Sequence, residues 1–120
     1  MSIVIRGRIP SKKNSRINTR SGMSFPSSKY TAWHKDASLQ LIGVNKIPSG
    51  SFISLHFYMP DNRRTDLSNK AESIMDCLVD NEIIEDDCWQ IVPILALKGC
   101  GIDKENPRVE IFVTPNPGII

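Results

Sequence analysis

The chain has 120 residues, of which 40% are hydrophobic and 23% are charged, as in ordinary soluble globular proteins. No apolar run approaches the roughly 20 residues that a membrane-spanning helix needs, and the basic residues at the start follow a short apolar stretch, the reverse of a secretory signal. We therefore expect a cytoplasmic protein, without a membrane partner, that forms one domain over residues 1–120.

Charge is divided unevenly along the chain. Residues 1–46 contain nine Lys or Arg and one acid, a net charge of +8, whereas residues 47–120 contain six basic and twelve acidic residues, a net charge of −6. This division predicts a basic surface for a polyanion beside an acidic site for cations. The alternative is a basic loop that is solvated and binds nothing.

The first half of the chain predicts two strands and one helix. Residues 2–9 alternate and are rich in β-branched side chains, which is typical of a strand. Residues 10–28 are polar and basic and predict a long loop with a hairpin around residues 20–22. Apolar residues at helical spacing follow over 29–43, and residues 51–59 alternate again as a second strand.

The second half predicts one helix and two strands. Residues 66–80 place apolar side chains at helical spacing, residues 89–97 are apolar, and residues 108–114 alternate. Pro93 argues for a sheet edge or a bulge in the third strand. Together these elements predict an α+β fold, in which a small antiparallel or mixed sheet of about four strands packs with two helices.

Asp66 lies at the start of the predicted helix over 66–80. A carboxylate there has two interpretations. It can stabilise the helix N-terminus through the dipole and the free N–H groups, or it can serve as a hard oxygen ligand for Mg²⁺. Residues three and four apart are neighbours on a helix, so Asn69, Lys70 and Ser73 share its polar side.

Three successive acids, Glu85, Asp86 and Asp87, follow this helix. Such a cluster costs stability unless it is solvated or neutralised by a cation. If the turn folds back, Asp86 or Asp87 would approach Asp66, and two carboxylates from different elements would hold one metal ion that activates water against a phosphodiester. A solvated acidic turn is the competing interpretation.

Basic residues near Asp66 suit contact with a phosphate. Arg63 and Arg64 offer planar guanidinium groups for phosphate oxygens. Lys70 is spaced to stabilise negative charge that develops during cleavage. The alternative for Lys70 is a surface lysine on an exposed helix face.

The stretches RRTDLSNK, IMDCL and IIEDD, with the earlier loop PSKKNSR, resemble the RusA-type Holliday junction resolvases, which are phage and prophage endonucleases of DNA recombination and repair. The resemblance runs over nearly the whole chain and is most specific from Asp61 to about Val92. It implies a homodimeric metal-dependent endodeoxyribonuclease that binds four-way DNA junctions and makes symmetric paired nicks. It also implies Mg²⁺, or Mn²⁺ as a substitute, as the cofactor.

When the family's essential aspartates are matched to this sequence by position, the resemblance implies that they are Asp66 and Asp87, with Asp86 beside the second. Two departures stand out: Ser68 occupies the place of a second aspartate in the family pattern D-L-D-N, and Glu72 occupies the place of the family's lysine. Either Lys70 and Glu72 exchange the lysine and acid roles, or fewer carboxylates hold the metal. The expected sites are catalytic Asp66, Asp87 and Lys70; metal-binding Asp66, Asp86, Asp87 and Glu72; and DNA-binding Lys12, Lys13, Arg16, Arg20, Arg63, Arg64 and Asn69.

Two other functions are compatible with these residues. In one, the protein binds junctions or other nucleic acid without cutting, because Ser68 has ended catalysis. In the other, it is a protein-interaction domain with no nucleic-acid role. For a homodimer, residues 83–97 are the expected contact region, and two acidic sites would then face two strands of a junction.

Overall fold

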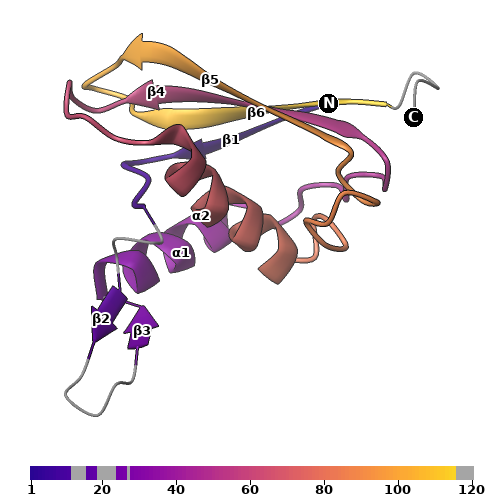
Figure 1. Ribbon diagram of the computed structural model, residues 1–120, viewed down its shortest axis with the longest axis horizontal. Coiled ribbons are helices and arrows are strands. Elements are labelled where there is room, and N and C mark those ends of the chain that lie inside the picture. The colour runs from indigo at the N-terminus through magenta and orange to yellow at the C-terminus, as the bar shows by residue number, and fades with distance from the viewer. Residues whose placement is uncertain (12–15, 19–23, 27, 116–120) are drawn as a thin grey trace.

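The computed structural model describes the backbone of residues 1–11, 16–18, 24–26 and 28–115, and the side chains of residues 1–11 and 28–115. Within these ranges, no helix is long and apolar enough to cross a membrane. Figure 1 shows a four-stranded sheet with two helices on one side of it. The predicted α+β fold is therefore confirmed.

The sheet is mixed, with strand order β1-β6-β4-β5. Strand β6 (Arg108–Thr114) pairs antiparallel with both β1 (Ser2–Arg6) and β4 (Phe52–Met59), whereas β5 (Ile94–Ile102) pairs parallel with β4. A parallel pair needs a crossover connection, and helix α2 (Leu67–Asp80) lies in the crossover between β4 and β5. This β4–α2–β5 unit places Glu72 of α2 in one cavity with Leu95 and Leu97 of the edge strand β5.

A separate two-stranded antiparallel sheet joins β2 (Arg16–Asn18) to β3 (Ser24–Pro26). The hairpin predicted within the basic loop is therefore confirmed, although its tip at residues 19–23 lies outside the described residues. Helix α1 (Ser28–Gln40) follows the hairpin.

The core lies between the sheet and the helices. The inward residues of β4, Ile53, Leu55 and Phe57, are each 1% exposed or less, and Ile74 and Leu78 of α2 are fully buried. This agrees with the alternation and the helical spacing predicted from the sequence. The other residues of β4 lie on the opposite face of the sheet, where the rings of His56 and Phe112 are 4.7 Å apart; no described helix covers this face.

The third strand differs from the prediction. Residues 89–97 were expected to be extended, but residues 88–92 form a turn, in which the N–H groups of Ile91 and Val92 donate to the carbonyl of Cys88 at 3.1 and 2.9 Å. The strand begins after Pro93 and continues to Ile102, five residues beyond the expected end at residue 97. Parallel pairing with β4 starts at Ile94 and Phe52, so the pairing register, which local composition does not encode, decides where the strand begins.

Candidate active site

Asp66 is the residue that precedes α2, with an extended backbone (φ −90°, ψ 126°) and no capping hydrogen bond from its side chain. Its side chain is exposed. The structure therefore shows no hydrogen bond by which the Asp66 side chain would cap the helix. Because the carboxylate is not committed to the helix N-terminus, it is available to a ligand.

A cavity of about 200 Å³ lies between α2 and β5, and its two acidic residues are Glu72 and Asp87. Glu72 comes from the second turn of α2, whereas Asp87 comes from the turn after the helix. The other residues that line the cavity are Ser68, Ala71, Met75, Leu95 and Leu97. Two exposed carboxylates from different elements thus line one cavity whose other side chains are mostly apolar.

The pKa of the Asp87 carboxyl lies above its usual value. Desolvation is the largest cause, followed by a hydrogen bond with the Asp86 side chain and by the negative charges of Asp86 and Asp76. The Asp87 amide also donates to Oδ1 of Asp86 at 2.8 Å. The same like charges that disfavour an ionised Asp87 would favour a bound cation.

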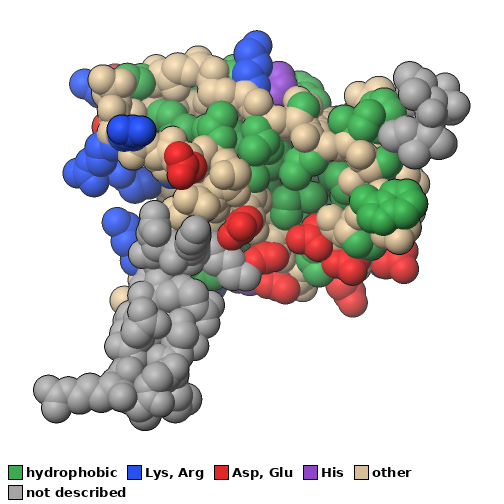
Figure 2. Space-filling model, viewed as in Figure 1, with side chains coloured by type: hydrophobic (Ala, Val, Ile, Leu, Met, Phe, Trp, Pro, Cys, Tyr) green, Lys and Arg blue, Asp and Glu red, His purple; other side chains and the backbone are tan. Residues whose placement is uncertain are grey.

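Asp76 is the residue that the sequence analysis missed. It lies four residues after Glu72 and therefore on the same side of α2, and its charge reaches Asp87. The i, i+4 spacing of two acids on one helix is the sequence signal that could have identified it. Figure 2 shows Asp and Glu side chains gathered along the face that carries α2 and the turn after it.

Within the described ranges, no three His, Cys, Asp or Glu residues lie close enough together to form a complete metal site. Asp66 does not line the cavity that Glu72 and Asp87 share. The residues present nevertheless fit Mg²⁺, because this ion is commonly held by one or two carboxylates, with water and substrate phosphate oxygens as its other ligands. Glu72 and Asp87 supply such a pair of oxygen donors.

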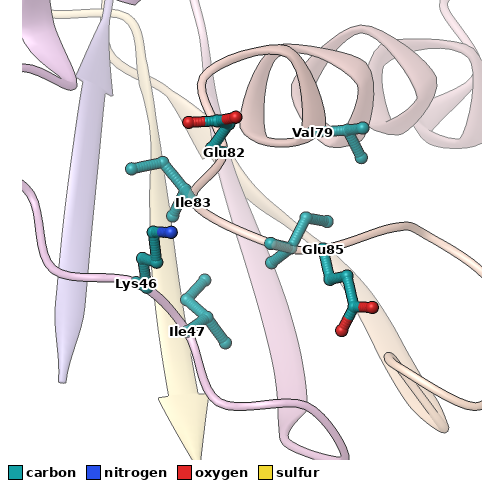
Figure 3. Close-up of a pocket in the computed structure, with 7 residues that line it drawn as sticks. Lys46, Ile47, Val79, Glu82, Ile83 and Glu85 are labelled. Carbon is teal, nitrogen blue, oxygen red and sulfur yellow. The ribbon is translucent and has the colours of Figure 1, made fainter.

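Two side chains of the acidic turn, Glu85 and Asp87, line different cavities. Glu85 lines a second cavity of about 350 Å³, shown in Figure 3, which also involves Lys46 and Glu82 around aliphatic side chains. An oxygen of Glu85 accepts a hydrogen bond from the Ser49 hydroxyl at 3.3 Å. Glu85 therefore belongs to a different surface from Asp87, and it offers a matched control within the same turn.

Lys70 lies on a buried side of α2, with 9% of its surface exposed. Its ammonium donates to the carbonyl of Ile9, and the Ser73 hydroxyl donates to the carbonyl of Pro10 at 2.7 Å. The pKa of Lys70 is lowered, first by desolvation and then by the positive charge of Arg8, and the charge of Asp61 partly opposes this. The surface-lysine alternative is therefore wrong, because this polar side of the helix packs against carbonyl groups that need donors.

A second group of charges surrounds Asp61. Arg8 donates to Asp61 at 2.6 Å, and the Arg63 amide donates to it at 3.0 Å. These contacts lower the pKa of Asp61, the Arg63 amide having the larger effect. The Arg63 side chain is 80% exposed and that of Arg64 is exposed. In Figure 2, Lys and Arg side chains gather beyond one end of the acidic face.

The structure describes the remaining predicted DNA-binding residues only in part. Asn69 is half-buried on α2. Arg16 lies in β2, but its side chain is outside the described part of the structure, as are Lys12, Lys13 and Arg20 entirely.

The family of the chain follows from comparison with known proteins. The family model described as Endodeoxyribonuclease RusA matches residues 7–114, which is nearly the whole chain. The protein therefore belongs to the RusA endodeoxyribonuclease family, and the resemblance noted in its sequence is confirmed. A comparison with curated proteins gives no match.

Proposed function

We propose that this nuclease is a Mg²⁺-dependent, structure-selective endodeoxyribonuclease that resolves four-way DNA junctions by symmetric paired nicks. The observation that carries the proposal is the cavity in which Glu72 and Asp87 meet, in a chain whose family is defined by endodeoxyribonuclease activity. Mn²⁺ is the expected substitute for Mg²⁺, because both are hard ions that accept carboxylate, water and phosphate ligands.

In this proposal, Asp87 and Glu72 hold the ion from two sides of the cavity. Asp86 supports Asp87 through their hydrogen bond and is a further ligand. Asp66 contributes its uncommitted carboxylate from the N-terminal end of α2. When bound, such an ion supplies an activated water and stabilises charge on a phosphate. The apolar residues Met75, Leu95 and Leu97 line the same cavity beside the carboxylates.

We assign Lys70 a positioning role. Its ammonium is engaged with the Ile9 carbonyl, and it lies about 200° around the helix from Glu72 at roughly 100° per residue. Lys70 and Ser73 together hold the two residues that lead into the basic loop. The contacts thus support a part in placing the loop's phosphate-binding residues rather than direct action on the scissile phosphate.

Binding of DNA would rest on the basic residues. Arg63 and Arg64, both exposed, would contact phosphates beside the acidic cavity. The basic residues of the loop, Lys12, Lys13, Arg16 and Arg20, together with Asn69, complete the proposed surface.

We further propose that the protein acts as a homodimer, because two opposed strands need two sites. Within the expected contact region, Ile83, Ile84 and Val92 are buried in the core of their own subunit. The parts available to a partner are therefore Trp89, which is 70% exposed, and the edge strand β5, where Ile94 and Leu95 are 39% and 41% exposed.

Cleavage of a synthetic four-way junction in Mg²⁺ tests the proposed function. We expect paired nicks that disappear with EDTA and fall by about 100-fold or more in Asp87→Asn and Glu72→Gln. Glu85→Gln removes the same kind of charge from the same turn and should keep the activity. Nicking that survives in EDTA would contradict the metal role, and equal cleavage of plain duplex would contradict junction selectivity.

A second candidate is a junction-binding protein that does not cut. The absence of a complete three-residue metal site from the described ranges, together with Ser68 at the cavity rim, favours it. Tight junction binding with no nicking in Mg²⁺ or Mn²⁺ would establish this alternative.

A further inference from the structure

The turn that carries Asp87 also presents a tryptophan to solvent. Trp89 lies two residues after Asp87 and is 70% exposed, whereas Trp33 is 8% exposed. Among the described residues, the Trp89 side chain makes no hydrogen bond and no ring contact. Tryptophan is on average a highly buried residue, so a ring that is 70% exposed is available to contact another molecule.

The backbone around Trp89 is held firmly. The amides of Ile91 and Val92 donate to the Cys88 carbonyl at 3.1 and 2.9 Å, and the Gly50 amide donates to the Ile91 carbonyl at 2.7 Å. Val92 is 7% exposed and so fixes the end of the turn in the core. A tryptophan has only two side-chain torsions, so this ring can bind a ligand at a low cost in conformational entropy.

The short separation of Trp89 from Asp87 along the chain suggests what the ring contacts. Two residues of chain span at most about 7 Å, and successive nucleotides of a duplex strand rise by about 3.4 Å. A phosphate bound through the proposed metal ion at Asp87 would therefore place the neighbouring one or two bases within reach of Trp89. The negative charge of residues 85–87 repels further phosphates, whereas the uncharged ring suits the face of a base.

We propose that Trp89 stacks on a nucleobase beside the scissile phosphate and thereby favours branched DNA over plain duplex. The proposal rests on the proposed function, since it requires DNA at Asp87. In a continuous duplex each base already stacks on its neighbours, and extracting one costs a few kcal/mol. At a branch point the strands pass from one arm to another, so a base beside it can leave its stack at lower cost than a base within a continuous duplex.

The proposal is tested by measuring DNA binding in Ca²⁺ in place of Mg²⁺, so that binding is measured separately from cleavage. The probe is a four-way junction with 2-aminopurine beside the branch point, and a plain duplex of the same sequence is the comparison. Trp89→Ala should lower junction affinity by about 5- to 100-fold, reduce the 2-aminopurine response and leave duplex affinity unchanged. Trp89→Phe should retain most of the affinity because phenylalanine also stacks.

Two controls make the result specific. Leu39→Ala removes another exposed apolar side chain, 59% exposed on α1, and should leave junction affinity unchanged. In the wild type, junction but not duplex should shield Trp89 from an added quencher, and the buried Trp33 supplies the constant background.

The outcomes separate this proposal from the proposed function. If the wild type binds junctions and responds through Trp89 but never nicks them, the nuclease proposal fails and the stacking proposal stands. If Trp89→Ala binds junction as the wild type does while nicking persists, the stacking proposal is overturned. Dissociation of the Trp89→Ala subunits, with equal losses of junction and duplex affinity, would instead place Trp89 in a subunit contact and also overturn it.

Discussion

Glu72 of α2 and Asp87 of the turn after it line one cavity against β5, although the second half of the helix separates them in sequence. The fold brings them together because the β4–α2–β5 crossover returns the chain across the face of α2 to the sheet edge. The charge of Asp76, from the same side of the helix, adds to the negative potential at Asp87. A cation at this place would relieve the repulsion that these carboxylates exert on Asp87.

The raised pKa of Asp87 predicts that metal binding depends on pH. A carboxylate must be ionised to hold a cation, and Asp87 ionises at a higher pH than an ordinary aspartate, chiefly because of desolvation and then because of Asp86. The increase in Tm caused by Mg²⁺ should therefore vanish as the pH falls through this raised pKa, above the value of about 3.9 for a free aspartate.

Without metal, the sign of the stability effect is opposite. The folded state holds the Asp87 proton more tightly than the unfolded state, so the free energy of unfolding should decrease as pH rises from about 3.9 through the folded pKa. Thermal unfolding of the wild type and of Asp87→Asn, with and without Mg²⁺, measures both effects. Identical pH profiles for the two proteins would contradict the assignment.

Replacement of Lys70 should weaken the attachment of α2 to the start of the basic loop. Lys70→Met keeps the aliphatic length but leaves the buried Ile9 carbonyl without its donor, which should lower the free energy of unfolding by about 1–2 kcal/mol. Urea unfolding measures the change. Lys29→Met, at an exposed position, is the matched control and should cost less than about 0.5 kcal/mol.

The lowered pKa of Lys70 supplies a second measurement. The folded state binds this proton less tightly than the unfolded state, so the wild type should gain stability as pH rises from the folded pKa towards about 10.4. Lys70→Met should lack that gain. An equal gain in both proteins would mean that another group is responsible.

Arg63 and Arg64 should contribute to affinity for DNA of any sequence or shape. Each Arg→Ala variant that loses one phosphate contact should reduce the slope of log affinity against log salt by about 0.9. Junction and duplex affinities should fall together, as measured by anisotropy titration at several salt concentrations. Lys98→Ala removes an exposed charge from β5 as a control. An unchanged slope for the Arg variants would exclude them from the interface.

The backbone of Glu82 is predicted to be strained, and substitution by glycine should relieve the strain. It follows α2 with φ 57°, a left-handed conformation that costs an L-residue other than glycine about 1 kcal/mol. Glu82→Gly should raise the free energy of unfolding by about 0.5–1 kcal/mol. Glu85→Gly, in the same turn but without positive φ, should not. A loss of stability in Glu82→Gly would show that contacts of Glu82 around the cavity in Figure 3 outweigh the strain.

Local patterns in the sequence were enough to predict much of the fold. The alternation over residues 51–59 predicted β4 to within one residue of its observed bounds, and the helical spacing placed α2 within one residue of its observed start. The polar basic segment before α1 contained the predicted hairpin. These features depend on how apolar side chains repeat along a single strand or helix, and that repeat can be read directly from the sequence.

Contacts between elements could not be predicted in the same way. The start of β5 depends on its register with β4, and the burial of Lys70 depends on the carbonyl groups that pack against α2. Likewise, the sequence presented Glu85, Asp86 and Asp87 as one acidic run, whereas the structure directs Glu85 and Asp87 to different cavities.

For the candidate site, the sequence by itself determined the family, the acidic helix and the acidic turn after it. Only the tertiary structure decided that Glu72 is the partner of Asp87 in the cavity, that Asp76 adds its charge, and that Asp66 lies outside the cavity lining. The physical reason is that a carboxylate's neighbours are set by how the helix is rotated against the sheet. That rotation is chosen by burial of the apolar face of α2, residues Ala71, Ile74 and Leu78, and not by the acids themselves.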